Sequence, residues 1–156
     1  MTTRMDLPTA APRPYAALLG VERSLEGDVR LLDLLRLRAS QINGCAYCID
    51  RHWRDLRASG ETEERLYGLD GWRESPRYSE RERVALALCE AMTLVAGSPV
   101  PDPVWEAAAG TFPAHELAQI LVVVGMINAW NRVLIAIRAE PGRDHPPALR
   151  PRVRAS

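Results

Sequence analysis

Two thiols and an imidazole lie within eight residues of this sequence, at Cys45, Cys48 and His52. If the segment is helical, at about 100° per residue, the three side chains project within about 60° of one another. The preceding Asn43-Gly44 pair breaks the helical pattern, so Cys45 is expected to open a new helix. Unpaired N–H groups and the helix dipole favour a thiolate there. The spacing therefore predicts a dithiol and its base on one helical face.

A thiol-redox interpretation gives each of these residues a task. His52 accepts a thiol proton, and the resulting thiolate attacks a peroxide or a disulfide. The second cysteine condenses with the sulfenic acid, and the disulfide protects the sulfur from over-oxidation until an external dithiol reduces it. Cys48 lies one turn from His52, whereas Cys45 has the better position in the helix dipole, so which thiol reacts first stays open.

Other uses of a CxxC pair fit the sequence less well. Covalent haem needs a histidine directly after the second cysteine, where this chain has Ile49. Structural zinc needs four ligands, and the other candidates, Cys89, His115 and His145, are single and scattered. We expect no metal and no cofactor, with Cys89 in the core and His115 at the surface.

An acidic residue, Asp33, interrupts a leucine-rich stretch. It is either a buried carboxylate with a raised pKa that relays protons to His52, or a solvated ion pair with Arg36, three residues along. The sequence leaves both interpretations open. The series of alternating charges that follows the dithiol predicts a solvated helix face: Asp50, Arg51, Arg54, Asp55 and Arg57.

The chain as a whole predicts an all-α fold, because strand patterns are nearly absent and helix start and stop residues recur. We expect an N-terminal arm over 1–14, a helical domain over 15–140 and a C-terminal tail over 141–156. Two helices are apolar over most of their circumference, which predicts a homo-oligomer. Helices are expected near 15–20, 26–42, 45–59, 62–69, 79–97, 102–110 and 113–138.

Composition excludes several classes of function. With 156 residues and 47% apolar content the chain suits one domain, and its 20 acidic and 20 basic residues give no electrostatic case for nucleic acid or membrane partners. Every basic residue other than histidine is arginine, so Schiff-base chemistry is excluded. The N-terminus lacks the apolar core of a signal peptide, which predicts a cytoplasmic protein. The apolar run Leu117–Trp130 is too short for a membrane span and predicts a buried helix.

The segment from Asp33 through LLRLRASQINGCAYCIDRHWRDLRASGETEERLYGL resembles the carboxymuconolactone decarboxylase superfamily, in particular the alkylhydroperoxidase AhpD-like branch with its CxxCxxxH core. The resemblance covers about residues 15 to 95. It implies an all-α fold, a trimer or hexamer, and a proton relay of Asp33, Cys45, Cys48 and His52. The usual acid is glutamate, so Asp33 is one methylene shorter. Tyr47 stands where some members have histidine and is expected to donate a hydrogen bond to bound peroxide or to pack at a subunit contact.

The resemblance implies a thiol-dependent alkylhydroperoxide reductase, an antioxidant peroxidase whose substrate is a hydroperoxide. Its electrons come from a thiol reductant: a lipoyl group, a thioredoxin-like protein or a small thiol. Two alternatives stay open. One is a decarboxylase-like lyase that uses His52 and Asp33 as acid and base, and the other is a non-catalytic redox-sensing module.

Overall fold

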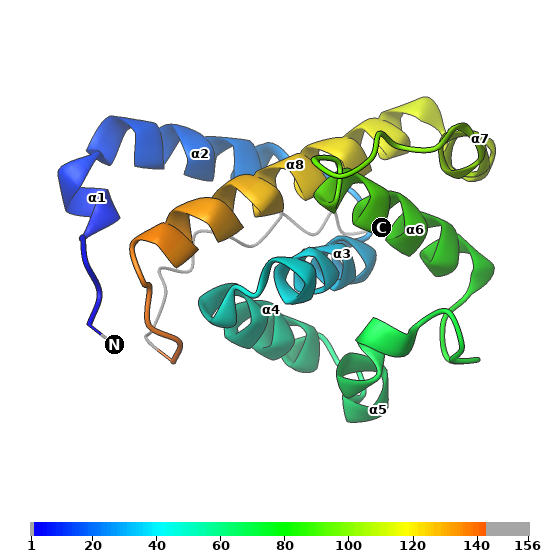
Figure 1. Ribbon diagram of the computed structural model, residues 1–156, viewed down its shortest axis with the longest axis horizontal. Coiled ribbons are helices and arrows are strands. Elements are labelled where there is room, and N and C mark those ends of the chain that lie inside the picture. Colours follow the sequence, from blue (N-terminus) through cyan, green and yellow to red (C-terminus); the bar gives the residue numbers. More distant parts are fainter. Residues whose placement is uncertain (1, 143–156) are drawn as a thin grey trace.

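The computed structural model describes residues 2–142, and in that range the protein is entirely helical, as the sequence predicted. Eight α-helices and one short 3-10 helix follow one another, joined by short loops (Figure 1). Their bounds are α1 Leu7–Ala10, α2 Pro12–Ser24, α3 Val29–Asn43, α4 Ala46–Ala58, α5 Glu63–Tyr67, η1 Leu69–Gly71, α6 Glu80–Thr93, α7 Asp102–Thr111 and α8 Ala114–Ala136.

Helix α3 is the centre of the fold, because α4, α6 and α8 all pack against it (Figure 1). Its leucines are almost wholly excluded from solvent, with Leu34, Leu35 and Leu37 at most 1% exposed. A helix that is apolar on nearly every side must be covered on several sides, and here the cover comes from within the chain. The polar side chains in the middle of α3, Asp33 and Arg36, are therefore held in a buried setting.

The junction of α3 and α4 is a tight turn that sets the position of the dithiol. Gly44 has a φ of 71°, a left-handed conformation that glycine adopts without strain, and it ends α3. Cys45 is the N-cap of α4, and its backbone N–H donates to the carbonyl of Ser40 at 3.0 Å. The expected helix break and the expected opening of a new helix at Cys45 are both confirmed.

The prediction of an extended arm before residue 15 is wrong, because α1 and the start of α2 occupy residues 7 to 14. Both helices carry proline in the first turn, where its missing N–H would be unbonded in any case. The N-terminal segment is tied to the end of α8 by the backbone N–H of Arg4, which donates to the carbonyl of Ile137 at 2.8 Å. Residues 143–156 of the expected tail lie outside the described residues.

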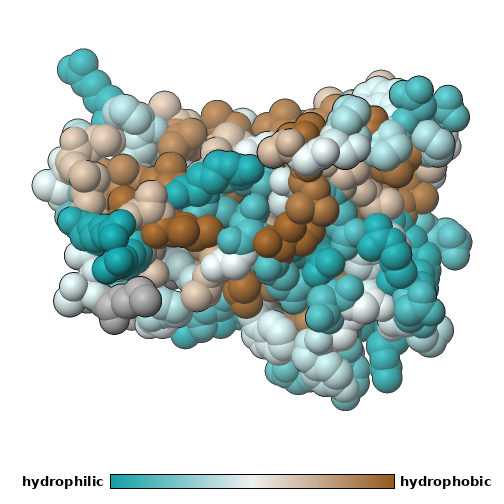
Figure 2. Space-filling model, in the orientation of Figure 1, coloured by the Kyte–Doolittle hydropathy of each residue, from teal (hydrophilic) through white to brown (hydrophobic). Residues whose placement is uncertain are grey.

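Helix α8 is long and apolar enough to cross a membrane by length and composition alone. Here one side of it packs into the core, through Ile120, Val123, Val124 and Ile127. The opposite side is open, which the prediction of a buried helix did not foresee: Val122 is 44% exposed. Figure 2 shows hydrophobic surface in the upper half of the molecule, where α2 and α8 run, and mostly hydrophilic surface around α5.

Candidate active site

The two cysteines of the CxxC segment are joined as a disulfide, and their Cα atoms are 5.4 Å apart. This separation lies in the usual range for bridged cysteines. Cys45 caps α4, Cys48 lies in its first turn, and each is only 1% exposed. The helical spacing predicted from the sequence thus brings the two sulfurs within bonding reach.

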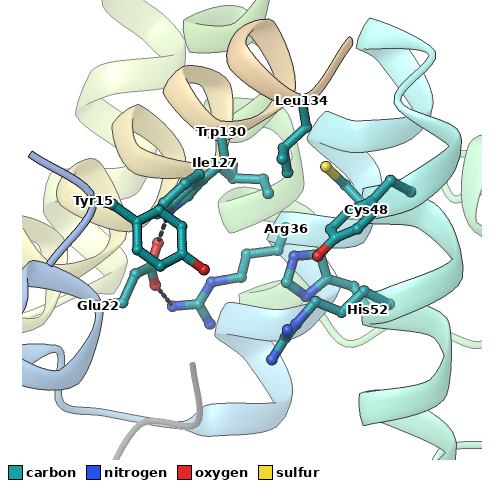
Figure 3. A pocket seen from close by; sticks show the side chains of 10 residues that line it. Tyr15, Glu22, Arg36, Cys48, His52, Ile127, Trp130 and Leu134 are labelled. Atoms are coloured by element: carbon teal, nitrogen blue, oxygen red, sulfur yellow. Dashed lines mark hydrogen bonds and ion pairs between the residues drawn. The ribbon is translucent and has the colours of Figure 1, made fainter. Parts of the chain in front are cut away.

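A cavity of about 50 Å³ opens beside Cys48, bounded by α2, α3, α4 and α8 (Figure 3). Its volume is enough for a few water molecules or a ligand of similar size. The lining combines an apolar wall from α8 with polar and reactive groups from the other helices. The lining residues are Tyr15, Glu22, Arg36, Tyr47, Cys48, Arg51, His52, Ile127, Trp130 and Leu134.

His52 lies one turn beyond Cys48 and is 7% exposed. Its Nδ1 is 3.9 Å from Oδ1 of Asp33, on α3. That distance suits an ion pair and is longer than a direct hydrogen bond, but catalytic contacts are often loose before substrate binds. The carboxylate, the imidazole and Cys48 therefore meet across the α3–α4 interface.

Asp33 is the end of a buried chain of charged groups. Its Oδ1 accepts a hydrogen bond of 2.9 Å from Nη1 of Arg36, and Nη2 of Arg36 donates at 2.9 Å to Oε2 of Glu22, from α2. Trp130 of α8 donates its indole N–H to the other oxygen of Glu22 at 3.1 Å. Figure 3 shows Glu22 between Arg36 and the α8 side chains. Three helices thus converge to hold Asp33 in place.

Burial raises the pKa of the Asp33 carboxyl above its usual value of 3.8, and the nearby Asp55 adds to that effect, while Arg36 and Arg51 oppose it. Asp33 is 8% exposed, and loss of water is the main cause of the shift. A carboxyl group with a raised pKa keeps its proton to a higher pH than a free carboxyl group does. Such a group is suited to taking and returning a proton.

Tyr47 lies half-buried in the first turn of α4 and lines the cavity. Burial raises the pKa of its phenol, although the Arg51 guanidinium beside it acts in the opposite direction. The phenol therefore keeps its proton at neutral pH and remains a hydrogen-bond donor.

A second and larger hollow, of about 340 Å³, lies on the Cys45 side of the disulfide. Cys45, Tyr47, Leu134 and Arg138 are among its lining residues. Tyr47 and Leu134 belong to both linings, so they separate the hollow from the cavity beside Cys48. The disulfide is thus approached from two sides, by a narrow cavity at Cys48 and by a wider hollow at Cys45.

The structure brings together all five residues that the sequence singled out: Asp33, Cys45, Tyr47, Cys48 and His52. For Asp33 each interpretation contained part of the answer, since the carboxyl does pair with Arg36 but the pair is buried rather than solvated. Sequence reasoning missed Glu22, because the helix expected near 15–20 ended before it, whereas α2 continues to Ser24.

The predicted solvated face of α4 is wrong at one position. Arg51 is only 8% exposed, whereas Arg54 keeps its side chain 57% exposed beside Asp50. Charge alternation does not reveal which turn of a helix another helix covers, so the sequence held no indication of this burial.

The remaining sulfur and imidazole candidates lie away from the site. Cys89 is fully buried in α6, where burial raises the pKa of its thiol to about 12, and His115 is exposed at the start of α8. His145 falls outside the described residues. Within residues 2–142 no group of three or more His, Cys, Asp or Glu side chains is placed to hold a metal ion.

Comparison with protein families and relatives adds an independent line of support. Residues 10–91 match the model of the Carboxymuconolactone decarboxylase family, a span that contains all five predicted site residues. The chain is 34% identical over 142 residues to the uncharacterized protein YdfG of Bacillus subtilis (strain 168), covering 88% of this chain and 95% of that protein.

Two solved structures share the architecture. A protein of unknown function from Agrobacterium tumefaciens, described as a putative antioxidant defence protein AhpD, superposes with a TM-score of 0.88 at 34% identity, over 92% of this chain and 100% of that one. An uncharacterized peroxidase-related protein from Ralstonia eutropha JMP134, with an alkylhydroperoxidase AhpD core, has a TM-score of 0.75 at 17% identity. That match covers 86% of this chain and 74% of the other, and at this identity it shows the fold alone.

Proposed function

Because the chain belongs to the Carboxymuconolactone decarboxylase family, we propose that it is a thiol-dependent hydroperoxide reductase of the AhpD-like branch. One observation carries the proposal: Cys48 of a disulfide-forming pair lines a small cavity together with His52, and the imidazole of His52 lies 3.9 Å from the Asp33 carboxyl, whose pKa is raised. A lyase would need the acid and base but would have no use for a bridging dithiol at the same cavity.

The cycle begins with the reduced dithiol. His52 takes the proton of the Cys48 thiol, and Asp33 steadies the imidazolium that results, through Nδ1. The Cys48 thiolate attacks the outer oxygen of the hydroperoxide, the O–O bond breaks, and the alkoxide leaves as the alcohol after taking the proton back from His52. Sulfur is oxidised to sulfenic acid and the peroxide is reduced by two electrons.

Cys45 completes the oxidative half of the cycle. Its sulfur attacks the Cys48 sulfenic acid, a disulfide forms, and hydroxide leaves as water with the proton that the Cys45 thiol gave up. Two electrons and two protons from a dithiol reductant then restore both thiols. The wider hollow at Cys45 offers that reductant a route that the Cys48 cavity does not. A lipoyl group, a thioredoxin-like protein and a small thiol are the candidate donors, and a cycle that needs reduction suits the cytoplasm.

Peroxide consumption by the purified protein tests this function. We expect turnover of tert-butyl hydroperoxide with at least one of dihydrolipoamide, reduced thioredoxin or dithiothreitol, and loss of turnover in Cys45→Ser and Cys48→Ser. Cys89→Ser is the matched control, since its buried thiol is expected to leave turnover unchanged. Absence of turnover with every donor would refute the proposal, and so would activity that survives in Cys48→Ser.

A further inference from the structure

Arg51 is a buried cation whose donors are only partly used. The residue is 8% exposed, and its Nε and Nη1 atoms are buried without a hydrogen-bond partner among the described residues. The nearest carboxylate oxygen that pairs with it belongs to Asp55, at 3.4 Å from Nε, which is too long for a good hydrogen bond. Buried donors of this kind are costly unless something bonds to them.

Arg51 borders the cavity of the candidate active site. It lines the same cavity as Cys48 and His52, three residues after the first and next to the second on α4. The other arginine of that lining, Arg36, already donates to Asp33 and Glu22. Arg51 instead hydrogen-bonds the phenol of Tyr47, and its Nε and Nη1, covered by the surrounding side chains in this disulfide form, bond to nothing among the described residues.

The ligand that suits such a group is small and anionic. A guanidinium binds a carboxylate through two parallel N–H···O bonds, and such charge-assisted bonds are stronger where water is excluded. The cavity of about 50 Å³ favours a short occupant. A carboxylate on Arg51 would leave the rest of a short molecule beside Cys48.

From these contacts we infer that Arg51 is a substrate-binding residue, and that the cavity selects compact hydroperoxides that carry a carboxylate over neutral alkyl hydroperoxides. The inference builds on the proposed function, because it names the class of substrate that the same cavity takes. Losing a charge-assisted hydrogen bond in a buried site costs a factor of about 10 to 100 in binding. The carboxylate-binding step itself needs no peroxide chemistry and is open to a separate test.

Alkylation of the reduced protein supplies that test, because iodoacetate and iodoacetamide differ by little more than a carboxylate. Peptide mass spectrometry measures the alkylation rate of Cys48 with each reagent. The iodoacetate rate is divided by the iodoacetamide rate, and this ratio is divided by the same ratio for N-acetylcysteine. We expect a normalised ratio of about 10 to 100. Propionate should slow the reaction with saturation, and propionamide should not.

Substitutions then assign the preference to one side chain. Arg51→Gln should bring the normalised ratio close to one, and Arg51→Lys should keep part of the preference because it keeps the charge. Arg54→Gln is the matched control, since it removes the same charge from an exposed position of the same helix, and the ratio should persist. The iodoacetamide rate shows that the Cys48 pocket is still formed in each variant.

Three outcomes would overturn the inference: a wild-type ratio equal to that of the free thiol, a ratio that survives in Arg51→Gln, or a ratio lost equally in Arg54→Gln. The proposed function can fail separately. A protein that prefers iodoacetate through Arg51 but consumes no peroxide has the carboxylate site without the peroxidase. In an active enzyme, 3-hydroperoxypropanoate should have a lower KM than tert-butyl hydroperoxide, and Arg51→Gln should remove that difference.

Discussion

At the scale of single residues, the site depends on the Asp33 carboxylate, which interacts with two partners. Oδ1 of Asp33 binds Arg36 at 2.9 Å and lies 3.9 Å from Nδ1 of His52. The arginine favours the charged carboxylate, whereas burial favours the neutral acid, and burial prevails. The pKa of Asp33 is therefore higher than that of a free carboxyl group, and its side chain is one methylene shorter than the glutamate usual in the AhpD-like branch.

Replacing His52 should affect both thiol ionisation and turnover. In His52→Ala the pH profile of iodoacetamide alkylation should move toward that of a free thiol, near pH 8.5, because the proton acceptor is gone. Turnover should fall by about 100- to 10,000-fold, the usual contribution of a general base. Asp33→Asn should lose less, since it acts through His52. The exposed His115→Ala is the control, and a wild-type profile in His52→Ala would instead favour activation of Cys45 by the helix dipole.

The raised pKa of Asp33 predicts a dependence of stability on pH. The folded protein holds this proton in a range where the unfolded chain has lost it, so the carboxyl lowers the free energy of unfolding as pH rises from about 3.8 through the folded pKa. Asp33→Asn has no such titration. The wild-type minus variant difference in free energy of unfolding should therefore fall with rising pH and then level off.

Urea unfolding of both proteins in the disulfide form, from about pH 4 to pH 8, measures this difference. A difference that rises with pH would mean that ion pairing outweighs burial at Asp33, and the assignment would be wrong.

At the scale of the elements, the sequence predicted the half of the site that lies along one helix and the turn before it. The spacing of Cys45, Cys48 and His52 needs only helical geometry, and Asn43-Gly44 marks the junction by turn chemistry. The other half depends on packing between helices distant in the chain. Nothing in the local pattern reveals that Glu22 of α2 reaches across to Arg36 of α3, or that α8 covers both.

Prolines explain why the start of α2, before residue 15, escaped prediction. A proline-rich composition argues against a helix, but Pro12 and Pro14 lie in the first turn of α2, where they cost the helix no hydrogen bond. The burial of Arg51 was also missed, because it depends on the helices that pack against α4 and not on the residues of α4 itself.

The contacts of Glu22 predict a large contribution to stability. Glu22→Ala removes one of two carboxylate partners of the buried Arg36 and the acceptor for Trp130. Breaking a buried ion pair from one side costs about 3–5 kcal/mol, because the remaining charge is left uncompensated. Urea unfolding gives this value, with the exposed Glu106→Ala expected to change little. A loss below about 1 kcal/mol would show that Arg36 is held by Asp33 alone.

At the scale of the whole molecule, the apolar surface is spread unevenly. Helix α8 gives one side to the core and leaves Val122 and Ile135 exposed at 44% and 45%. Figure 2 shows hydrophobic surface over the part of the molecule that holds α2 and α8. Exposed apolar side chains can mark a contact with another protein, and a second copy of the chain is the partner we expect.

Assembly should therefore depend on the open side of α8. Light scattering is expected to give a multiple of the 17.4 kDa chain, a trimer or a hexamer, for the wild type. Val122→Glu should shift the protein toward the monomer, because a carboxylate would have to lose its water in the contact. Ala109→Glu, on the exposed side of α7, is the control. A wild-type monomer at micromolar concentration would contradict the expectation.

The deep burial of Cys89 gives the protein an internal standard for thiol titration. A thiol whose pKa is about 12 and which solvent cannot reach does not react with Ellman's reagent while the fold is intact. Cys48 and Cys45 border the cavity and the hollow, so the native chain should titrate as zero thiols when their bridge is closed and as two when it is open. A third equivalent appears only on unfolding. The number of thiols that react per chain thus distinguishes opening of the disulfide from unfolding.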